Sequence, residues 1–584
     1  MSLYISVLWA GFLLSHPLPT SQSCSTGLAN ECKEAELAPG TNLAGEGFDI
    51  TKMQRKGAYV LNLDVWKRKD KTCTICRNPY LDGKMQKLPL SVVDWRPNHQ
   101  CNMKVSSTIH QSSESLVSSS SNSVENNWKI NLEVTGKVSG SLMMAGTHSK
   151  LADYSMDKTK KDKFSFTSHQ VSCLYYSYRV SNKPHLHREF LRAVQNLPKA
   201  YTHENKPRYY KLIDIFGTHY ITKVELGGSV HSVTSIRQCE ASLQGLNVEE
   251  VKTCLDVEAA ASVGFKAKLS TEVKHCNTVM NKMDNKVSFS SRFNDRFTEI
   301  RGGHTTQPDL LFSANKEVGA YKEWMQSLIV NPDLVSYSLD ALHELLPTTN
   351  PVRSNLRKAI SHYILEKSLW KNCSAPCTAG VKTHPKDSCI CTCHNNPGVT
   401  PDCCPSQKGL ARVKITMQKA VGLWGDYNTG TDGYVKLFHL RKELGRTRSI
   451  YNTNNPHWDW TFELGSVILL IDDQVIFEVW DEDNKWDDDF LGKCSVQLIS
   501  GVNTDLCKLN HGELYYKIEV ECAPSLGGRT CDKYIESPMN FHLEKAYVSR
   551  NARPVPKEML VKMGVLMDDY PSYANHSISS VIKN

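Results

Sequence analysis

Residues 128–142 read WKINLEVTGKVSGSL, with apolar or small side chains at every even position and polar side chains at every odd position. Because successive side chains of a strand point to opposite faces, this alternation predicts a β-strand. At about 3.3 Å per residue the strand would span roughly 50 Å, whereas a usual globular strand has about 5 to 6 residues and a membrane-spanning strand about 9 to 11. The predicted strand is unusually long for a soluble sheet.

A second region, residues 257–293, shows the same alternation. Apolar side chains take the odd positions and charged or polar ones the even positions, for example Val257, Val263, Val273, Val279, Phe289 and Phe293 against Glu258, Lys266, Glu272, Lys274 and Arg292. The later part would be a hairpin partner of the earlier part. Residues 128–142 would pair with a return strand that starts near Phe164, across a tip containing Lys158, Lys160, Lys161 and Lys163. Two long amphipathic hairpins favour a membrane barrel, and a large sheet with one wet face is the alternative.

Length, charge and the N-terminus limit the class of protein. A chain of 584 residues predicts three or four domains. The net charge of +8 suits an anionic membrane surface, and the interspersed signs make nucleic acid a weaker candidate. The apolar run from Tyr4 to Leu14, followed by Pro17 and Pro19, predicts a secretory signal over residues 1–23. No later run approaches the roughly 20 apolar residues of a spanning helix, so we expect a chain that is soluble when made and that inserts conditionally.

The 20 cysteines indicate disulfides formed in an oxidising compartment. Nine cysteines precede residue 300, seven lie between Cys373 and Cys404, and four lie from residue 494 to residue 531. The two odd counts indicate one bond between the first two regions, and our guess for it is Cys239 with Cys404. Sequons at Asn372 and Asn575 are candidate glycosylation sites and are consistent with secretion.

The domain organisation follows from changes in these patterns. Residues 24–350 mix long strands with helical stretches, and residues 351–372 read as an amphipathic connecting helix. Residues 373–408 hold too little apolar mass for a core and predict a disulfide-rich module. Short strands separated by turns predict a β-sandwich over residues 409–505, followed by a C-terminal segment, residues 506–584. The expected fold class is therefore multidomain α+β with a separate all-β domain.

Two acidic loops of the predicted sandwich carry the clearest chemistry. GLWGD, ending at Asp426, is followed by Asp432, and VWDED, which contains Asp481 and Asp483, is followed by Asp489. Carboxylates that converge from two loops are what a hard ion such as Ca²⁺ requires, since it takes about 6 to 8 oxygen ligands. The arrangement resembles the C2 domain, a calcium-dependent lipid-binding module. The resemblance implies that the calcium ligands are Asp426, Asp432, Asp481, Asp483 and Asp489, with Asp487 and Asp488 as further candidates.

Aromatic side chains lie in the same loops. Trp424, Tyr427 and Trp486 would enter the interfacial layer of a membrane once the ion bridges protein and phospholipid. Ordinary loop packing is the alternative, above all for Tyr427.

The first region contains the motif FGTHY, residues 216–220, which is followed by a pair of glycines at residues 227 and 228. This motif resembles the signature of the membrane attack complex/perforin domain, and the signature residues are Gly217, Thr218, His219, Tyr220, Gly227 and Gly228. Glycines within a strand indicate a bend or a close approach of backbone, and we interpret His219 as structural. The resemblance covers residues 30–350 and implies a bent four-stranded sheet with two helical clusters, residues 128–180 and 240–295. The clusters would be helical in the soluble state, and the alternating pattern would describe the inserted state.

The order of modules implies a calcium-dependent pore former within this family, because the terminal complement components carry other flanking modules. The C2 domain would dock on a phospholipid membrane, and subunits would assemble into a ring or arc and insert their hairpins as a transmembrane β-barrel. The resemblance also implies secretion, storage in the lumen of cytolytic granules, insertion into the target-cell plasma membrane, and granule serine proteases as cargo. Asp340 with Arg208 or Lys211 are candidates for charged contacts between subunits.

Two features depart from the family pattern, and two other functions compete. The resemblance implies that the cysteine-rich module, residues 373–408, is EGF-like, but it has seven cysteines instead of the usual six. Asn484 stands where the family can place an aromatic anchor. A calcium-dependent membrane adaptor that does not perforate is the alternative function. We expect no enzyme, because the chain has no Gly-x-Ser-x-Gly motif and the stretch from His343 to Pro347 lacks the second histidine of the zinc-protease pattern.

Overall fold

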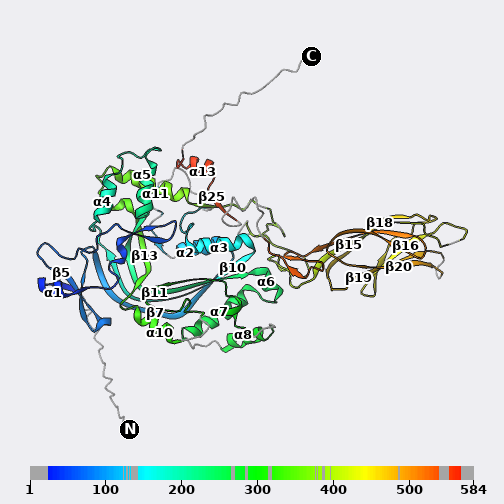
Figure 1. The fold of residues 1–584 in the computed structure, drawn as a ribbon, viewed down its shortest axis with the longest axis horizontal. Helices are drawn as coiled ribbons and strands as arrows, with labels where there is room; N and C mark the ends of the chain where they lie inside the picture. The colour runs from blue at the N-terminus through cyan, green and yellow to red at the C-terminus, as the bar shows by residue number, and fades with distance from the viewer. Residues whose placement is uncertain are drawn as a thin grey trace, which may run out of the picture.

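The computed structural model describes residues 24–122, 124–126, 129, 132, 142–264, 270–282, 287–312, 318–374, 376–377, 379–383, 389–394, 396–425, 427–483, 487–537 and 551–566. The predicted signal, most of residues 128–142, and Asp426, Trp486 and Asn575 lie outside these ranges. A broad N-terminal body and an elongated sandwich are joined by a short cysteine-rich module (Figure 1). Among the helices of the described ranges, none is both long enough and apolar enough to cross a bilayer.

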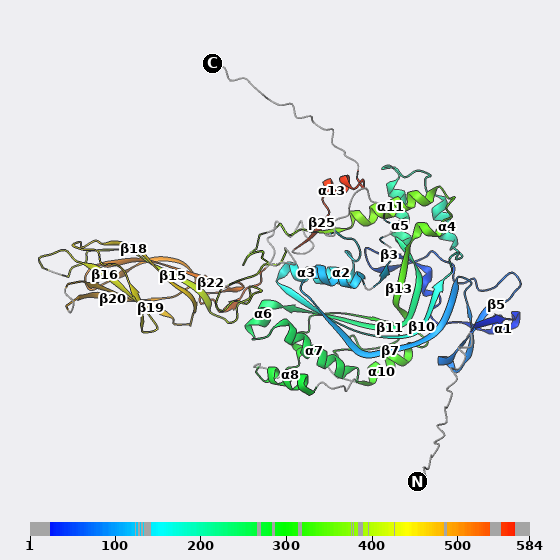
Figure 2. The same cartoon turned by 180° about the vertical axis from the view of Figure 1, so that it is seen from behind.

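One sheet, antiparallel except for the pairing of β8 (Glu125–Asn126) with β13 (Asp333–Ala341), organises the N-terminal body. Its other strands are β7 (Val92–His110), β10 (Phe164–Val180), β11 (His219–Arg237) and β12 (Arg296–Arg301), with β3 (Glu46–Asp49) and β4 (Gln54–Tyr59) beside them. β7 and β11 have 19 residues each and β10 has 17, far more than the usual 5 to 6 or so. The three long strands curve together (Figure 2). β-Branched and aromatic residues are frequent in β10 and β11, which favours strand over helix.

Neighbouring backbone and side chains approach Gly227 and Gly228 so closely that no side chain fits at either position without displacing them. A Cβ at Gly227 would lie 1.9 Å from the carbonyl oxygen of Cys173 on β10. A Cβ at Gly228 would lie 2.6 Å from the ring of Trp324, which belongs to α10 (Val318–Ser327). The register of β10 against β11 shifts nearby, between Leu174 and Tyr176. The close backbone approach that the two glycines indicated is therefore present in the fold.

Two helical clusters interrupt the sheet. The first holds α2 (Ser113–Asn122) and α3 (Lys150–Lys161) between β7 and β10, and the second holds α6 (Gln238–Leu243), α7 (Val248–Ser262), α8 (Ser270–Lys282) and α9 (Phe289–Arg292) between β11 and β12. Figure 1 shows α2 and α3 on one side of the long strands and α7 and α8 on the other. Apart from the turn at Val263 and Gly264, the described residues of the alternating region 257–282 are therefore helical here, as the family resemblance implied.

The first cluster is shorter than predicted. Residues 164–180 form strand β10, because they pair with β7 on one side and with β11 on the other. The lysine-rich stretch is helical in this structure, and its place at a hairpin tip of the inserted state stays a prediction. Lys158, Lys160 and Lys161 lie in the last turn of α3, directly before β10 begins at Phe164.

Helix α11 (Val352–Glu366) is the helix that was predicted to follow the first region, but it ends earlier than residue 372. Leu356, Ile360 and Ile364 are almost fully buried in the main core, and the helix packs against α5 (Lys206–Phe216). Residues Leu369–Lys371 form strand β14, which pairs with β9 (Leu142–Met143) and with β25 (Ala552–Pro554). The segment after α11 is thus a strand because two backbones offer it partners.

The N-terminal edge of the body carries a small disulfide-bonded sheet. Its elements are β1 (Cys24–Gly27), α1 (Ala29–Glu34), β2 (Glu36–Leu37), β5 (Cys73–Asn78) and β6 (Lys84–Leu88). Disulfides join Cys24 to Cys76 and Cys32 to Cys73. The remaining α-helices of the described ranges are α4 (Arg188–Gln195) and α13 (Lys557–Lys562).

The sandwich consists of two four-stranded sheets. One has the order β18 (His457–Ile468), β15 (Leu410–Val421), β22 (Glu513–Cys522), β21 (Gly501–Lys508), and the other β17 (Lys442–Arg446), β16 (Gly433–His439), β19 (Gln474–Asp481), β20 (Asp489–Gln497). Inward side chains such as Val413, Ile415 and Phe477 are fully buried between the sheets. The predicted boundary at residue 505 is too early, because β22 pairs with β15 along its whole length. The sandwich therefore extends to Cys522, and the short strands β23 (Leu526–Gly527) and β24 (Lys533–Tyr534) follow it.

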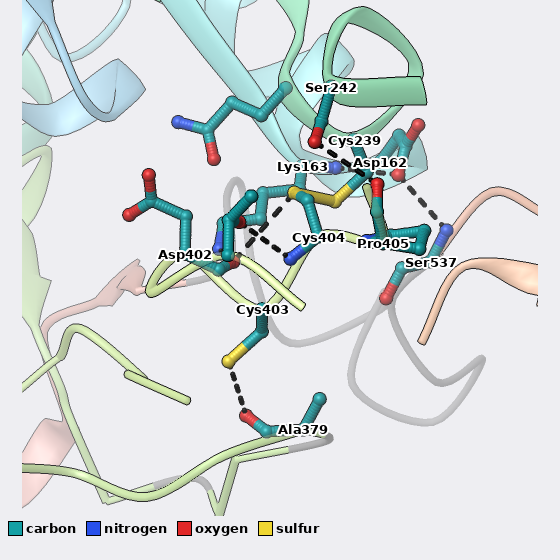
Figure 3. Close-up of a disulfide and its surroundings, with 12 residues drawn as sticks. Asp162, Lys163, Cys239, Ser242, Ala379, Asp402, Cys403, Cys404, Pro405 and Ser537 are labelled. Atoms are coloured by element: carbon teal, nitrogen blue, oxygen red, sulfur yellow. Dashed lines mark hydrogen bonds between the residues drawn. A yellow bond between two sulfur atoms is a disulfide. The ribbon is translucent and has the colours of Figure 1, made fainter. Parts of the chain in front are cut away.

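The cysteine-rich module is tied to the N-terminal body by one covalent bond. Three disulfides lie within the module, and its seventh cysteine, Cys404, bonds to Cys239 at the start of α6. Figure 3 shows this bond beside Asp162, whose buried carboxylate accepts a hydrogen bond from the backbone N–H of Ser537 (3.1 Å). The hydroxyl of Tyr534 donates to the same carboxylate. The segment after the sandwich and the cysteine-rich module thus meet at the ends of β10 and β11.

Candidate metal centre

The strand register brings three of the predicted ligands together at one end of a sandwich sheet. Gly433 on β16 lies opposite Asp481 on β19, and Asp481 lies opposite Asp489 on β20. Asp432 directly precedes Gly433. Because neighbouring strands lie about 4.7 to 4.9 Å apart, Asp432, Asp481 and Asp489 occupy adjacent positions on three strands. Asp483 follows two residues after Asp481 in the same loop.

Backbone hydrogen bonds hold two of these carboxylates in place. The N–H of Asp432 donates to Oδ1 of Asp481 (2.6 Å), and the N–H of Asn452 donates to Oδ1 of Asp432 (2.6 Å). The side chain of Asp481 is buried. A Cβ at Gly425 would lie 1.8 Å from Oδ2 of Asp481. The first acidic loop can therefore close over Asp481 only because residue 425 has no side chain.

The two further candidates play different roles. Tyr434 donates its hydroxyl proton to Oδ2 of Asp488 (2.7 Å), and the N–H of Asp483 lies 3.4 Å from Oδ1 of Asp488. Burial, and after it the hydrogen bond to Asp488, raise the pKa of Tyr434. Asp488 therefore braces the second acidic loop, whereas Asp487 makes no such bond to the residues that the structure describes.

The donor chemistry of this end fits a hard cation. Asp432, Asp481, Asp483 and Asp489 supply carboxylate oxygens only, which suit Ca²⁺ and not the softer ions that favour sulfur or imidazole. Within the described ranges, which leave out Asp426, no three His, Cys, Asp or Glu side chains are gathered closely enough to hold a metal ion by themselves. The residues present fit the ion in kind, and the assignment of individual ligands stays a prediction.

Exposed aromatic side chains surround the acidic end. Tyr427 is 89% exposed and Trp424 45% exposed, and their rings meet edge to face with centroids 5.2 Å apart. Sequence reasoning missed Tyr451, which is 67% exposed in the loop between β17 and β18. It precedes Asn452, whose N–H binds Asp432. The turn-rich run YNTNNP (residues 451–456) was the available signal, because it marks a third loop of the sandwich.

The signature residues of the first domain are structural. His219 is fully buried, and its Nδ1 lies 2.7 Å from Oγ1 of Thr218. Gly217 has φ +85°, and a Cβ there would lie 2.5 Å from the carbonyl oxygen of Phe48. Tyr220 pairs with Asp340 of β13. These contacts fix the start of β11 against β3 and β13.

The candidate surface residues lie on separate elements. Arg208 and Lys211 are exposed on α5. Burial, followed by the charge of Glu344, raises the pKa of Asp340 on β13. Oδ1 of Asn372 accepts a hydrogen bond from the N–H of Ser374 (2.9 Å) within its sequon. Their roles in subunit contacts and glycosylation stay predictions.

Known proteins match the chain from the central body to the sandwich. Family models match at residues 37–372 (MAC/Perforin domain), 372–406 (Perforin-1-like EGF domain) and 411–513 (C2 domain). Perforin-1 of Homo sapiens is 39% identical over 517 residues, which cover 88% of this chain and 93% of that protein. Perforin-1 of Mus musculus is 38% identical over 529 residues, covering 90% and 95%. Complement component C6 of Bos taurus is 28% identical over 216 residues, covering 35% and 22%.

These matches confirm the resemblance that the FGTHY motif and the acidic loops indicated. The MAC/Perforin match spans more than half of the chain, and both Perforin-1 sequences align over nearly all of it. The chain belongs to the perforin family, with a MAC/Perforin domain, an EGF-like module and a C-terminal C2 domain.

Proposed function

We propose that this chain is a calcium-dependent, pore-forming cytolytic protein. The observation that carries the proposal is the position of the two helical clusters in the sheet. Phe166 on β10 lies opposite His110 on β7, and Thr234 on β11 lies opposite Arg296 on β12. Phe164 lies opposite Arg237, so all four strands reach the same end of the sheet, where the clusters begin and end.

Unwinding both clusters would therefore lengthen four adjacent strands at once. The alternating residues 128–142 and 257–293 supply one apolar and one polar face to such strands. A lone hairpin in a bilayer would leave backbone N–H and C=O groups unpaired, so the hairpins of neighbouring subunits must pair into a closed barrel. A ring or arc of identical subunits is the assembly that this requirement favours.

Calcium and the exposed aromatics support docking before insertion. A bound Ca²⁺ ion would supply the positive charge that lets an acidic loop cluster approach phospholipid headgroups. Asp426, Asp432, Asp481, Asp483 and Asp489 would hold it, with Asp487 beside them. Trp424, Tyr427 and Trp486 would then enter the interfacial layer, where amphipathic aromatic rings are favoured.

The remaining expectations rest on membership of the family. We infer secretion through the N-terminal signal, storage in cytolytic granules, delivery of granule serine proteases through the pore, and no enzymatic activity of the chain itself. A membrane adaptor that does not perforate is less favoured, because the similarity to Perforin-1 covers the pore domain as well as the C2 domain.

Dye release from phospholipid vesicles tests the proposal. The wild-type chain should float with vesicles and release trapped dye only when calcium is present. Asp432→Asn should lose both effects, because it removes one ligand charge while Asn still accepts the hydrogen bond from Asn452. Asp472→Asn is the matched control, since Asp472 is exposed at the opposite end of the sandwich.

Two outcomes would contradict the proposal. Dye release by Asp432→Asn at the calcium concentration that suffices for the wild type would remove the metal assignment. If vesicles bind the wild-type chain at saturating calcium and yet keep their dye, the chain is a membrane adaptor and not a pore former.

A further inference from the structure

A disulfide joins the two main helices of the second cluster. Cys254 on α7 bonds to Cys276 on α8, with the two Cα atoms 5.5 Å apart. Both cysteines are buried. A separation of about 4.5 to 5.5 Å is also that of directly opposed residues in antiparallel strands. The bond is therefore compatible with a helical pair and with a hairpin.

The register of the sheet leads to the same two residues. Six consecutive pairs join β11 and β12 without a shift, from Ser229 opposite Arg301 to Thr234 opposite Arg296. In an antiparallel pair each step forward on one strand is a step backward on the other. Twenty further steps from Thr234 reach Cys254, and twenty steps back from Arg296 reach Cys276. The uninterrupted register of β11 and β12 would place the bonded cysteines directly opposite each other.

The alternation of apolar residues agrees with this register. When the register of β11 and β12 is continued in the same way, Val251 lies opposite Val279 and Val257 lies opposite Val273, so apolar residues share one face. The cysteines have the other parity and fall on the polar face, which lines the lumen of a membrane barrel. Backbone pairing, side-chain pattern and disulfide connectivity thus agree on one alignment.

We propose that the Cys254–Cys276 disulfide stays intact when the second cluster unwinds and fixes the register of the inserted hairpin. The proposal rests on the pore-forming function above and gives both cysteines a positioning role in it. The alternating pattern alone does not specify the register, because a slip of two residues returns every side chain to the same face. A covalent link between opposed positions removes that freedom. It also brings the two strands together before they pair, which lowers the entropic cost of closing the hairpin.

Disulfide trapping in assembled pores measures the register directly. With the native bond present, Lys252→Cys combined with Thr278→Cys forms the in-register pair and should cross-link under mild oxidation. Lys252→Cys combined with Met280→Cys is offset by two residues and should not cross-link. When Cys254→Ser and Cys276→Ser are added, both pairs should cross-link, because several registers are then populated.

Functional readouts accompany the trapping. The variant carrying Cys254→Ser and Cys276→Ser should bind vesicles with unchanged calcium dependence but form about tenfold fewer conducting pores, with a broader spread of conductance. The matched control removes the disulfide between Cys32 and Cys73, which lies in the small N-terminal sheet. That control should keep the narrow conductance distribution of the wild type.

Three results would overturn the inference. The first is a cross-link at the offset pair in the presence of the native bond. The second is free thiols at Cys254 and Cys276 in denatured wild-type pores. The third is wild-type conductance in the variant carrying Cys254→Ser and Cys276→Ser. Thiol labelling uses the unaltered chain, so it decides the question even if the variants fail to fold. Failure of the wild-type chain to release dye would instead contradict the proposed function, which separates the two failures.

Discussion

Protonation of His362 should weaken the N-terminal body in acid. His362 is 7% exposed on α11, and its Nδ1 lies 3.2 Å from the hydroxyl oxygen of Tyr201. Burial, with smaller effects of the charges of Lys358 and Lys206, lowers the pKa of His362 from 6.5 to about 4. The unfolded chain therefore binds a proton at this residue below pH 6.5, whereas the folded chain binds it only below about pH 4. The free energy of unfolding of the N-terminal body therefore contains the full contribution of neutral His362 above pH 6.5 and loses that contribution as pH falls toward 4.

The pKa difference sets the size of the effect. At about 1.4 kcal/mol for each pKa unit, complete titration removes about 3.4 kcal/mol, of which about 2 kcal/mol is lost at pH 5. His362→Asn should abolish this contribution, because the amide takes the position of Nδ1 beside Tyr201 and does not titrate. The variant should therefore lose about 2 kcal/mol less than the wild type between pH 7 and pH 5.

Native-state hydrogen exchange of the α11 amides is the appropriate assay, because a multidomain chain has no single unfolding free energy. Opening free energies at pH 7 and pH 5, corrected for intrinsic exchange, give the pH dependence directly. His203→Asn is the control, since His203 is exposed. Equal losses in the wild type and in His362→Asn would refute the reasoning.

Gly228→Ala should lower the thermal midpoint of the N-terminal body by several degrees, because its Cβ would overlap Trp324, and overpacking costs about 1 to 3 kcal/mol; scanning fluorimetry with an unchanged midpoint would contradict this. Gly425→Ala should raise the calcium concentration for half-maximal vesicle flotation about tenfold, because its Cβ displaces the Asp481 carboxylate, and circular dichroism should show the sandwich intact. Trp424→Ala should weaken vesicle binding at saturating calcium about tenfold, and an unchanged flotation curve would assign Trp424 to loop packing.

The sandwich could be predicted well from the sequence because each of its strands has one buried face and one solvent-exposed face. Along β22, Leu514, Tyr516, Ile518 and Val520 are buried while their neighbours are not. Such alternation can be recognised in the sequence of one strand without knowledge of the strands that pair with it. The acidic end could be predicted for a different reason. The ends of adjacent strands bring the loops that follow them together, so carboxylates in those loops were expected to lie near one another.

The second helical cluster shows why alternation misleads. Val251, Leu255 and Ala259 are buried on one face of α7, and their spacing of four residues is at once a helical repeat and an even number. Residues spaced by four therefore also share one face of a strand. The capping box of Asn247 and Glu250, which starts α7, was the local signal for helix.

Other features depended on partners distant in sequence. Strand β14 exists because residues 142–143 and 552–554 lie on either side of it. Tyr451 became a candidate only when the hydrogen bond of Asn452 placed its loop beside Asp432. Neither relation is encoded in the local pattern of residues.

The joint drawn in Figure 3 has a mechanical consequence. Cys404 and Tyr534 lie on either side of the sandwich in the sequence, and both are attached where β10 begins and β11 ends, through Cys239 and Asp162. If the sandwich docks on a membrane as proposed, a change in its tilt would be transmitted through these two attachments to the residues at which β10 and β11 would lengthen. The same two attachments would then link the position of the docked sandwich to the residues at which the strands lengthen.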